Sequence, residues 1–483
     1  MKRQFATSLA WAAAGNWSRE IINIFVFLTL ARLLGPRAYG VMGMVGVATA
    51  IADALLNNGL GNYIVREKRL EPAHIDAVFW IQLAVASVLS LAMVVGAPVL
   101  AAIYQEPDVA RILPVTAALP LLFALSSVPS AVLQRTMSFR PLTIRSFAAA
   151  AAGGVVGVGL ALTGGGVWSL VYMALTQWSV TCLILWTAAD WRPGFAVERR
   201  HVLDVMRFGS HAVGVKLLII LDQQLPRFII AATLGAVSLG FFTIAWRIVE
   251  VVGLLTLTPI AQVTLPTLGA LQDDRTRLRA GVAAIVGLTF AISLPCYVGL
   301  AAIAPVLMPV MSGHGWDGAV PVLQLFSLYG IASGLVVSLD SVMLATGRMV
   351  WRTQFTVFGV GLLAIGLAVA YPYGLTAMAT TMVAREFISG IIIAVALGRY
   401  GLAEGLEVLG RITPFVLAAA IMLAAVLSWQ HFLGVALNGP ALLASSIAAG
   451  TVVYGIGVFA FARNSTMQIV ELGLSRYRRK AVS

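Results

Sequence analysis

The chain has 483 residues, of which 60% are hydrophobic and only 11% are charged. Soluble domains are about a quarter charged, so this composition excludes a water-soluble globular protein. The 32 basic residues outnumber the 20 acidic ones, which gives a formal net charge of +12. In a soluble protein that excess would suggest nucleic-acid binding, whereas in a membrane chain the location of the cations decides their meaning. The composition indicates a polytopic membrane protein.

Apolar stretches of about 20 residues, bounded by Gly, Pro or charge, recur along the whole sequence. They predict an all-α fold with about fourteen transmembrane helices. The first stretch follows Lys2 and Arg3 like a secretory signal, but it contains Arg19 and Glu20 and continues to Leu34, so we expect an uncleaved helix. The predicted spans are residues 7–33, 40–60, 77–103, 109–134, 143–163, 167–188, 208–234, 238–267, 281–310, 319–346, 353–371, 375–398, 413–433 and 440–462.

Lys and Arg residues are distributed unevenly between alternate loops. One set of loops, counted with their immediate edges, holds 24 of the 32 cations, whereas the other set holds only Arg37 and Arg111. Because cytoplasmic loops carry the basic excess, both termini are predicted to be cytoplasmic. Topology and contact with anionic lipids explain the basic loops, so no nucleic-acid partner is predicted.

Two segments of the sequence repeat. Residues 31–40 read ARLLGPRAYG and residues 231–240 read AATLGAVSLG, and a looser match relates residues 133–145 to residues 344–352. A repeat of six helices returns to the same membrane side, which predicts two six-helix lobes related as parallel repeats around a central cavity. The predicted parts are an N-terminal lobe at 1–190, a C-terminal lobe at 191–410, two further helices at 411–463 and a basic tail at 464–483.

Three tracts, at residues 30–66, 128–140 and 221–248, carry a family resemblance. They resemble bacterial polysaccharide transporters, the Wzx-type flippases of lipid-linked oligosaccharides, whose superfamily also contains multidrug antiporters and the lipid II flippase. Gln223, Gln224 and Pro226 depart from the family pattern, which puts a transferred coupling role at these positions in doubt.

The resemblance implies movement of an undecaprenyl-diphosphate-linked oligosaccharide across the bacterial inner membrane by alternating access, for exopolysaccharide, capsule or O-antigen assembly. It implies no cofactor other than a proton or sodium gradient. The implied partners are the lipid-linked substrate, membrane lipids, and a polysaccharide polymerase with its export machinery.

Twelve charged residues fall inside or near the ends of the predicted spans. Each costs about 2.5–3.5 kcal/mol at a helix centre, so they are expected to line a polar cavity or to pair within the bundle. A diphosphate suits planar guanidinium groups. The predicted substrate-binding residues are Arg19, Lys216, Arg227, Arg247 and Arg385. Trp17 and Trp246 are weak candidates for stacking on sugars, and core packing is the favoured interpretation of each.

Carboxylates within the spans are the candidates for ion coupling, namely Asp222, Asp53, Asp340, Glu20, Glu250 and Glu386. Asp222 is the leading one because the ring of Pro226 clashes with the Asp222 carbonyl, and a kink there would free that oxygen for a cation. A proline kink without ion binding is the open alternative.

Two pairs of oppositely charged residues could serve the fold and not the substrate. Arg247 and Glu250 are three residues apart, so an ion pair is as plausible as a substrate contact. Arg385 and Glu386 are adjacent and should point in different directions on a helix, so each is expected to need a partner elsewhere.

Other functions are less consistent with the sequence. A lipid II flippase or a multidrug antiporter of the same superfamily stays open, although the internal cations count against an acid-dominated drug cavity. A membrane glycosyltransferase or polymerase would need carboxylates on a substantial outer loop, and the short outer loops offer little beyond His314 and Asp317. Sequence motifs for nucleotide binding, zinc binding and nucleophilic catalysis are absent, so no catalytic activity is predicted. The five histidines are scattered, and Cys182 and Cys296 lie in apolar runs, so no metal site is predicted either.

Overall fold

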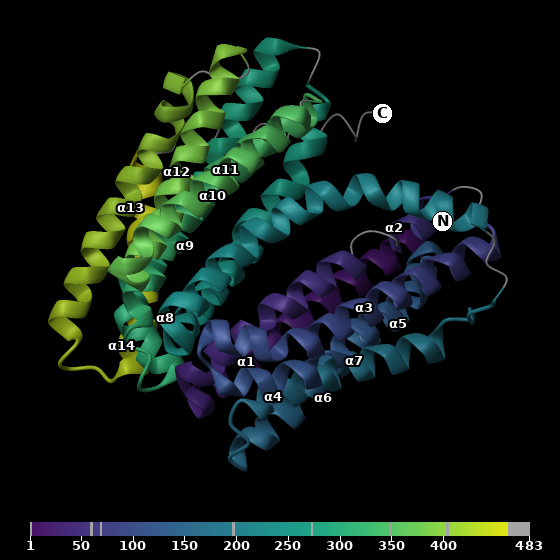
Figure 1. Cartoon of the computed structure of the whole chain (residues 1–483). Coiled ribbons are helices and arrows are strands. Elements are labelled where there is room, and N and C mark those ends of the chain that lie inside the picture. The colour runs from purple at the N-terminus through teal and green to yellow at the C-terminus, as the bar shows by residue number, and fades with distance from the viewer. Residues whose placement is uncertain are drawn as a thin grey trace. The chain divides into compact units, whose positions relative to one another are not determined.

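The computed structural model describes residues 2–57, 61–67, 70–195, 199–271, 274–347, 349–401 and 405–461. Within these ranges, the side chains of residues 2–18, 57, 62, 199–200, 204–217, 265, 349 and 405–407 lie outside the description. All regular structure in the described ranges is helical (Figure 1). The elements are α1 (Lys2–Asn57), α2 (Gly61–Arg66), α3 (Pro72–Tyr104), α4 (Pro107–Thr116), α5 (Ala118–Arg135), α6 (Phe139–Leu162), α7 (Trp168–Ala188), α8 (Arg199–Gly269), α9 (Arg275–Ser312), α10 (Ala319–Ala345), α11 (Met349–Ala370), the 3-10 turn η1 (Tyr371–Tyr373), α12 (Leu375–Arg399), α13 (Gly405–Leu433) and α14 (Gly439–Phe461).

Twelve helical segments in the described ranges are long and apolar enough to cross a membrane. Two of them, in α1 and α8, contain one residue with non-helical backbone torsion angles, which are Gly35 and Gly235. Each of these two segments therefore comprises a pair of consecutive helices. The predicted all-α fold with about fourteen spans is confirmed.

The two breaks have the same geometry. Gly35 has φ 73° and ψ 177°, and Gly235 has φ 76° and ψ −174°. Positive φ is accessible to glycine because it lacks a Cβ atom. Both glycines occupy the same position in the two repeated segments, so the shared geometry supports the predicted duplication.

The last glycine of each repeated segment lies against the other segment. A Cβ atom on Gly40 would overlap the backbone carbonyl oxygen of Ala236, and a Cβ atom on Gly240 would overlap that of Pro36. The contact is reciprocal, because each glycine meets the residue that follows the break in the other segment. Glycine at both positions is thus required for the close approach of α1 and α8.

A tyrosine and an ion pair stabilise the bend in α1 at Gly35. The Tyr39 hydroxyl donates a hydrogen bond to the Phe27 carbonyl oxygen at 2.6 Å, and the two rings pack edge to face. Arg37 Nη2 lies 2.7 Å from Glu106 Oε1, which precedes α4. These contacts hold the turn between the first two spans to the turn between α3 and α4.

The chain divides into two compact units, Met1–Gly240 and Phe241–Ser483. The first unit extends beyond residue 190, where the end of the N-terminal lobe is predicted, and takes in the beginning of α8. Inside it, α6 packs on α7 and α1, and α3 packs on α4 and α5. Two of its buried apolar clusters centre on Ile64 and Val78, and on Leu56 and Phe123.

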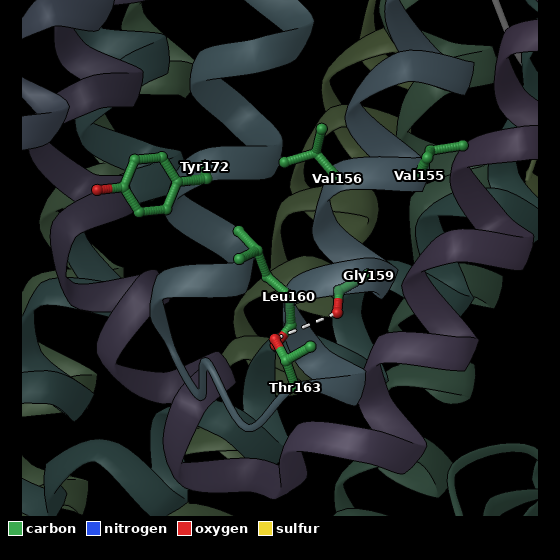
Figure 2. A pocket seen from close by; sticks show the side chains of 6 residues that line it. All are labelled: Val155, Val156, Gly159, Leu160, Thr163 and Tyr172. Atoms are coloured by element: carbon green, nitrogen blue, oxygen red, sulfur yellow. Dashed lines mark hydrogen bonds between the residues drawn. The ribbon is translucent and has the colours of Figure 1, made fainter.

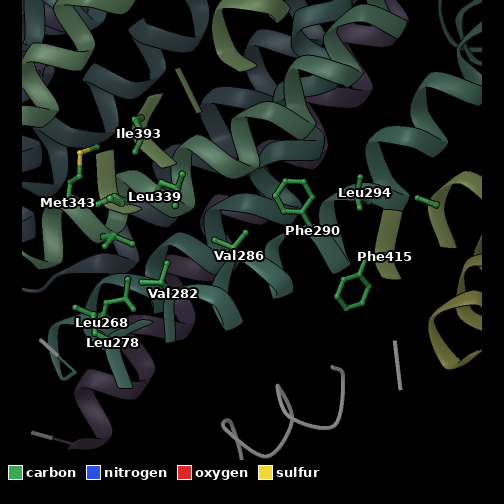
Figure 3. Packing of buried hydrophobic residues seen from close by; sticks show 13 residues of the cluster. Leu268, Leu278, Val282, Val286, Phe290, Leu294, Leu339, Met343, Ile393 and Phe415 are labelled. Carbon is green, nitrogen blue, oxygen red and sulfur yellow. The ribbon is translucent and has the colours of Figure 1, made fainter. Parts of the chain in front are cut away.

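The second unit is built around α9. Leu278, Val282, Val286, Phe290 and Leu294 recur at every fourth position of this helix and form one apolar row. The row packs against side chains of α10, α12 and α13, as Figure 3 shows. The two C-terminal helices, α13 and α14, pack on each other and on α9.

Candidate functional site

A pocket of about 180 Å³ lies between α1, α6 and α7 in the first unit. Its volume is large enough for a small polar group and too small for an oligosaccharide. The described residues that line it are Arg19, Asn23, Arg145, Ser146, Ala149, Ala150, Gln177, Trp178 and Thr181.

Close packing of α6 on α7 shapes this pocket. Ala149, Ala150 and Gly153 fall on one face of α6, and a Cβ atom on Gly153 would overlap the Gln177 side chain of α7. Small residues at helix contacts allow this approach. Trp178, the next residue, packs edge to face on Phe123 with ring centroids 4.4 Å apart. The tryptophan is therefore fixed by packing at the edge of the pocket.

The pocket is cationic. Arg19 and Arg145 are close enough to repel one another electrostatically, and the described lining residues include no carboxylate. Arg145 Nη1 donates a long hydrogen bond to the Ser130 hydroxyl at 3.5 Å. Two guanidinium groups around a small polar space form an arrangement that favours binding of an anion.

Sequence reasoning found one of these two arginines. Arg19 is a predicted substrate-binding residue, whereas Arg145 is one of the 24 cations that were assigned to the cytoplasmic loops and their edges. In the structure Arg145 lies within α6 and lines the pocket. Its position at the start of the small-residue face that contains Ala149 and Gly153 is the signal that could have identified it.

Arg247 and Glu250 form an ion pair. Arg247 Nη1 lies 2.8 Å from Glu250 Oε2, with side-chain exposures of 26% and 49%. The ion pair that the spacing allowed is therefore present, while a contact of Arg247 with substrate stays a prediction. The neighbouring Trp246 belongs to an aromatic cluster with Phe242 and Phe326, whose ring centroids lie 5.8 and 5.3 Å away.

Arg385 and Glu386 pair with each other, a contact that was not predicted, and each also has a hydrogen-bond partner on another helix, as predicted. Arg385 Nη1 lies 2.7 Å from Glu386 Oε2, and the two side chains are only 12% and 6% exposed. Their directions do differ along the helix, but the arginine stem is long enough to bring its guanidinium group back to the carboxylate. The Ser333 hydroxyl adds a long hydrogen bond to Glu386 Oε1 at 3.5 Å. The pair is thus enclosed among α10, α11 and α12, since Arg385 Nε also donates to the Gly359 carbonyl at 3.4 Å.

Asp340 is held by a cation from the next helix. Arg352 Nε lies 2.8 Å from Asp340 Oδ1 and 2.9 Å from Oδ2. This pair bridges the turn from α10 to α11, which gives the carboxylate a structural role. A coupling role for Asp340 stays a prediction.

The seventh predicted span lies in the first part of α8. Residues around Pro226 are helical, and the non-helical residue of α8 is Gly235. Arg227 Nη1 donates to Gln224 Oε1 at 3.4 Å, and the Asp222 side chain is half-buried. The break at Gly235 is the junction between the seventh and eighth predicted spans, and a coupling role for Asp222 stays a prediction.

The remaining candidates stay predictions. Glu20 and Asp53 are half-buried, and both make interactions within the structure. The side chains of Lys216 and Trp17 lie outside the described part of the chain.

A second, larger pocket is apolar. It measures about 510 Å³ and is lined by Val155, Val156, Gly159, Leu160, Thr163 and Tyr172. Figure 2 shows these side chains near the end of α6, with Tyr172 on the neighbouring helix and the Thr163 hydroxyl hydrogen-bonded to the Gly159 carbonyl. Val155 is 75% exposed, as expected for a surface that faces lipid tails. This pocket offers no charged group to a polar ligand.

Comparisons with known proteins identify relatives of this chain. It is similar to the succinoglycan biosynthesis transport protein ExoT of Rhizobium meliloti (strain 1021), with 27% identity over 321 residues, 66% of this chain and 65% of that protein. It is also similar to the teichuronic acid biosynthesis protein TuaB of Bacillus subtilis (strain 168), with 23% identity over 94% of each chain. The lipopolysaccharide biosynthesis protein WzxC of Escherichia coli (strain K12) is 23% identical over 74% of this chain and 73% of its own length.

Solved structures share the fold. The lipid II flippase MurJ in an inward closed conformation superposes with a TM-score of 0.74 at 14% identity, covering 94% of this chain and 99% of its own. An inward-facing multidrug resistance MATE family transporter gives a TM-score of 0.63 at 17% identity, covering 80% and 94% of the two chains. A family model described as polysaccharide biosynthesis protein matches residues 29–321. Because this match covers more than half of the sequence, the resemblance to polysaccharide transporters is confirmed, and the chain belongs to the polysaccharide biosynthesis protein family.

Proposed function

We propose that the protein is a transporter, not an enzyme, and that it moves a polyprenyl-diphosphate-linked oligosaccharide across the bacterial inner membrane. The observation that supports this proposal is the cationic pocket that contains Arg19 and Arg145. The names of the relatives, which include a transport protein for succinoglycan biosynthesis, agree with it. Lipid-linked substrate and membrane lipids are the proposed partners, together with a polysaccharide polymerase and its export machinery.

The pocket suits the diphosphate part of such a substrate. A diphosphate carries about two negative charges, and a planar guanidinium group can give each phosphate two parallel hydrogen bonds. Arg19 and Arg145 would hold the head group, while the amides of Asn23 and Gln177 would offer hydrogen bonds to the first sugar. The pocket volume of about 180 Å³ means that the rest of the glycan would extend outside it.

Transport against a gradient needs a source of free energy. We propose alternating access driven by a proton or sodium gradient, with a titratable carboxylate that binds the ion differently in the two states. Asp222 is the candidate favoured by the sequence. Glu386 is the most enclosed of the candidate carboxylates, and its ion pair with Arg385 would have to open or lose charge when the ion binds. Both chain termini are proposed to be cytoplasmic.

Other substrates are possible for this fold, since a lipid II flippase and a multidrug transporter share it. A transporter for cationic drugs would need an acidic binding site. The pocket between α1, α6 and α7 has the opposite charge among its described residues. It therefore favours a lipid-linked anion over a cationic drug.

Binding of undecaprenyl diphosphate to the purified protein tests the proposal. Arg19→Gln and Arg145→Gln should each weaken binding by roughly 10- to 150-fold, because a charge-assisted hydrogen bond contributes about 1.5–3 kcal/mol. Arg145→Lys should restore only part of the affinity, since an ammonium group cannot form the paired hydrogen bonds. Both glutamine variants should also fail to complement a strain that lacks its own oligosaccharide transporter.

Arg140→Gln is the matched control. Arg140 lies on α6 like Arg145, but its side chain is exposed and does not line the pocket. The control should bind undecaprenyl diphosphate and complement normally. If Arg145→Gln and Arg140→Gln bind equally well, the pocket is not the head-group site.

A further inference from the structure

Two histidines and a glutamate that are far apart in the sequence meet in the first unit. Glu71 immediately precedes α3, His74 lies in the first turn of α3, and His201 lies in the first turn of α8. One ligand atom from each residue lies within 4.8 Å of the other two. The five histidines are scattered in the sequence, and 130 positions separate Glu71 from His201.

The three side chains converge on a small, mostly buried space. His201 Nε2 lies 3.2 Å from Glu71 Oε2, and the rings of His74 and His201 pack edge to face with centroids 4.5 Å apart. His201 is 2% exposed and His74 is 8% exposed. The side chain of Glu71 is 56% exposed, so an ion could enter from that side.

Hydrogen bonds already involve the histidines of the cluster. The Glu71 backbone N–H donates a long hydrogen bond to His74 Nδ1 at 3.3 Å, so a metal bound at this nitrogen would have to replace that hydrogen bond. His201 Nδ1 is buried and has no hydrogen-bond partner among the described residues. Burial of an imidazole without full hydrogen bonding is costly. A metal bound to His201 Nε2 would take the place of the contact between that atom and Glu71 Oε2, and the proton of the ring would then lie on Nδ1.

We propose that Glu71, His74 and His201 form a binding site for a divalent transition metal of the zinc type. Imidazole nitrogens with one carboxylate oxygen are ligands that Zn²⁺ binds in tetrahedral geometry, and three protein ligands leave the fourth position to water. Bonds of about 2.0–2.2 Å place tetrahedral ligand atoms about 3.4 Å apart. Glu71 and His201 already have about this spacing, and the ligand atom of His74 lies within 4.8 Å of both.

The site would join two segments of the first unit. His201 follows the connection from α7 to α8, and that connection also contacts α3, since Trp191 Nε1 donates to Asp76 Oδ1 at 3.1 Å and Trp80 Nε1 donates to the Gly194 carbonyl at 2.8 Å. A bound metal would fasten the first turn of α8 to the first turn of α3. Because a metal that binds only the folded protein stabilises it, zinc would raise the resistance of the protein to heat.

Zinc titration of the full-length protein tests this site. The protein would be purified in detergent without a polyhistidine tag, treated with EDTA and titrated against a fluorescent zinc chelator. The wild type should bind one Zn²⁺ per chain, and His74→Gln, His201→Gln and Glu71→Gln should each lower the affinity at least tenfold. His314→Gln and His431→Gln, which change exposed histidines outside the cluster, should bind zinc like the wild type.

Two further measurements separate loss of a ligand from loss of the fold. The apparent unfolding temperature without metal should be similar for the wild type and Glu71→Gln, and zinc should raise it only in the wild type and in the two control variants. Co²⁺ bound in place of zinc should give the visible spectrum of a tetrahedral site in the wild type. The proposal is overturned if the wild type binds no zinc, or if folded His201→Gln and His74→Gln bind it with unchanged affinity. Neither result depends on the transport activity, so the site and the proposed function can fail separately.

Discussion

The reciprocal glycine contact between α1 and α8 gives a sharp prediction for Gly40→Ala. In the structure, a methyl group on Gly40 would overlap the Ala236 carbonyl oxygen. That oxygen belongs to the backbone and cannot rotate away as a flexible side chain could. The two helices would therefore have to separate where the repeated segments meet.

The size of the effect follows from a comparison with Gly46→Ala. Gly46 lies on the same helix, and a Cβ atom there would have no neighbour within 4 Å. Both substitutions gain about 0.5–1 kcal/mol from the better helix propensity of alanine, so this contribution cancels in the comparison. The difference between the two variants is then the cost of overpacking, about 1–3 kcal/mol.

Apparent unfolding temperatures of the purified protein measure this difference. Gly40→Ala should unfold roughly 2–12 °C below Gly46→Ala, because a loss of 1 kcal/mol lowers the unfolding temperature by about 2–4 °C for a unit of this size. Gly240→Ala should behave like Gly40→Ala, because its methyl group would overlap the Pro36 carbonyl. The double variant should lose less than the sum of the two, since separation of the helices relieves both overlaps. Equal stability of Gly40→Ala and Gly46→Ala would refute the close approach of the two segments.

Two more predictions concern the buried charges and the orientation. Arg385→Gln should lower the free energy of unfolding by about 3–5 kcal/mol and reduce the protein level in membranes, because buried Glu386 would lose the cation beside it. The double variant Arg385→Gln/Glu386→Gln should recover much of this loss. Arg247→Gln should cost less than about 1 kcal/mol because its pair with Glu250 is more exposed, and equal losses in thermal unfolding for Arg385→Gln and Arg247→Gln would contradict this account. Reporter fusions after residue 165 should be active in the periplasm and fusions after residue 199 in the cytoplasm; the reversed result would overturn the proposed orientation.

The sequence by itself determined the membrane class and the spans. Hydrocarbon of nearly constant thickness forces each span to contain about 20 apolar residues, and the polar backbone in lipid must be helical. These constraints act on neighbouring residues, so they can be predicted without the tertiary structure. The repeated segments also marked the breaks at Gly35 and Gly235 correctly, since positive φ is a local property of glycine.

The partners of the polar side chains were decided by the tertiary structure. Arg145 was assigned to the edge of a cytoplasmic loop, but in the structure it lines the same pocket as Arg19, between α1, α6 and α7. Arg385 and Glu386 were expected to point in different directions, but they form an ion pair and are enclosed by the surrounding helices. Likewise, His74 and His201 meet only because the connection to α8 folds back onto α3. Solvation by lipid determines which segments span the membrane. Contacts between helices are about as apolar as contacts with lipid, so small residues and polar pairs determine which helices pack together. These pairings are visible only in the packed structure.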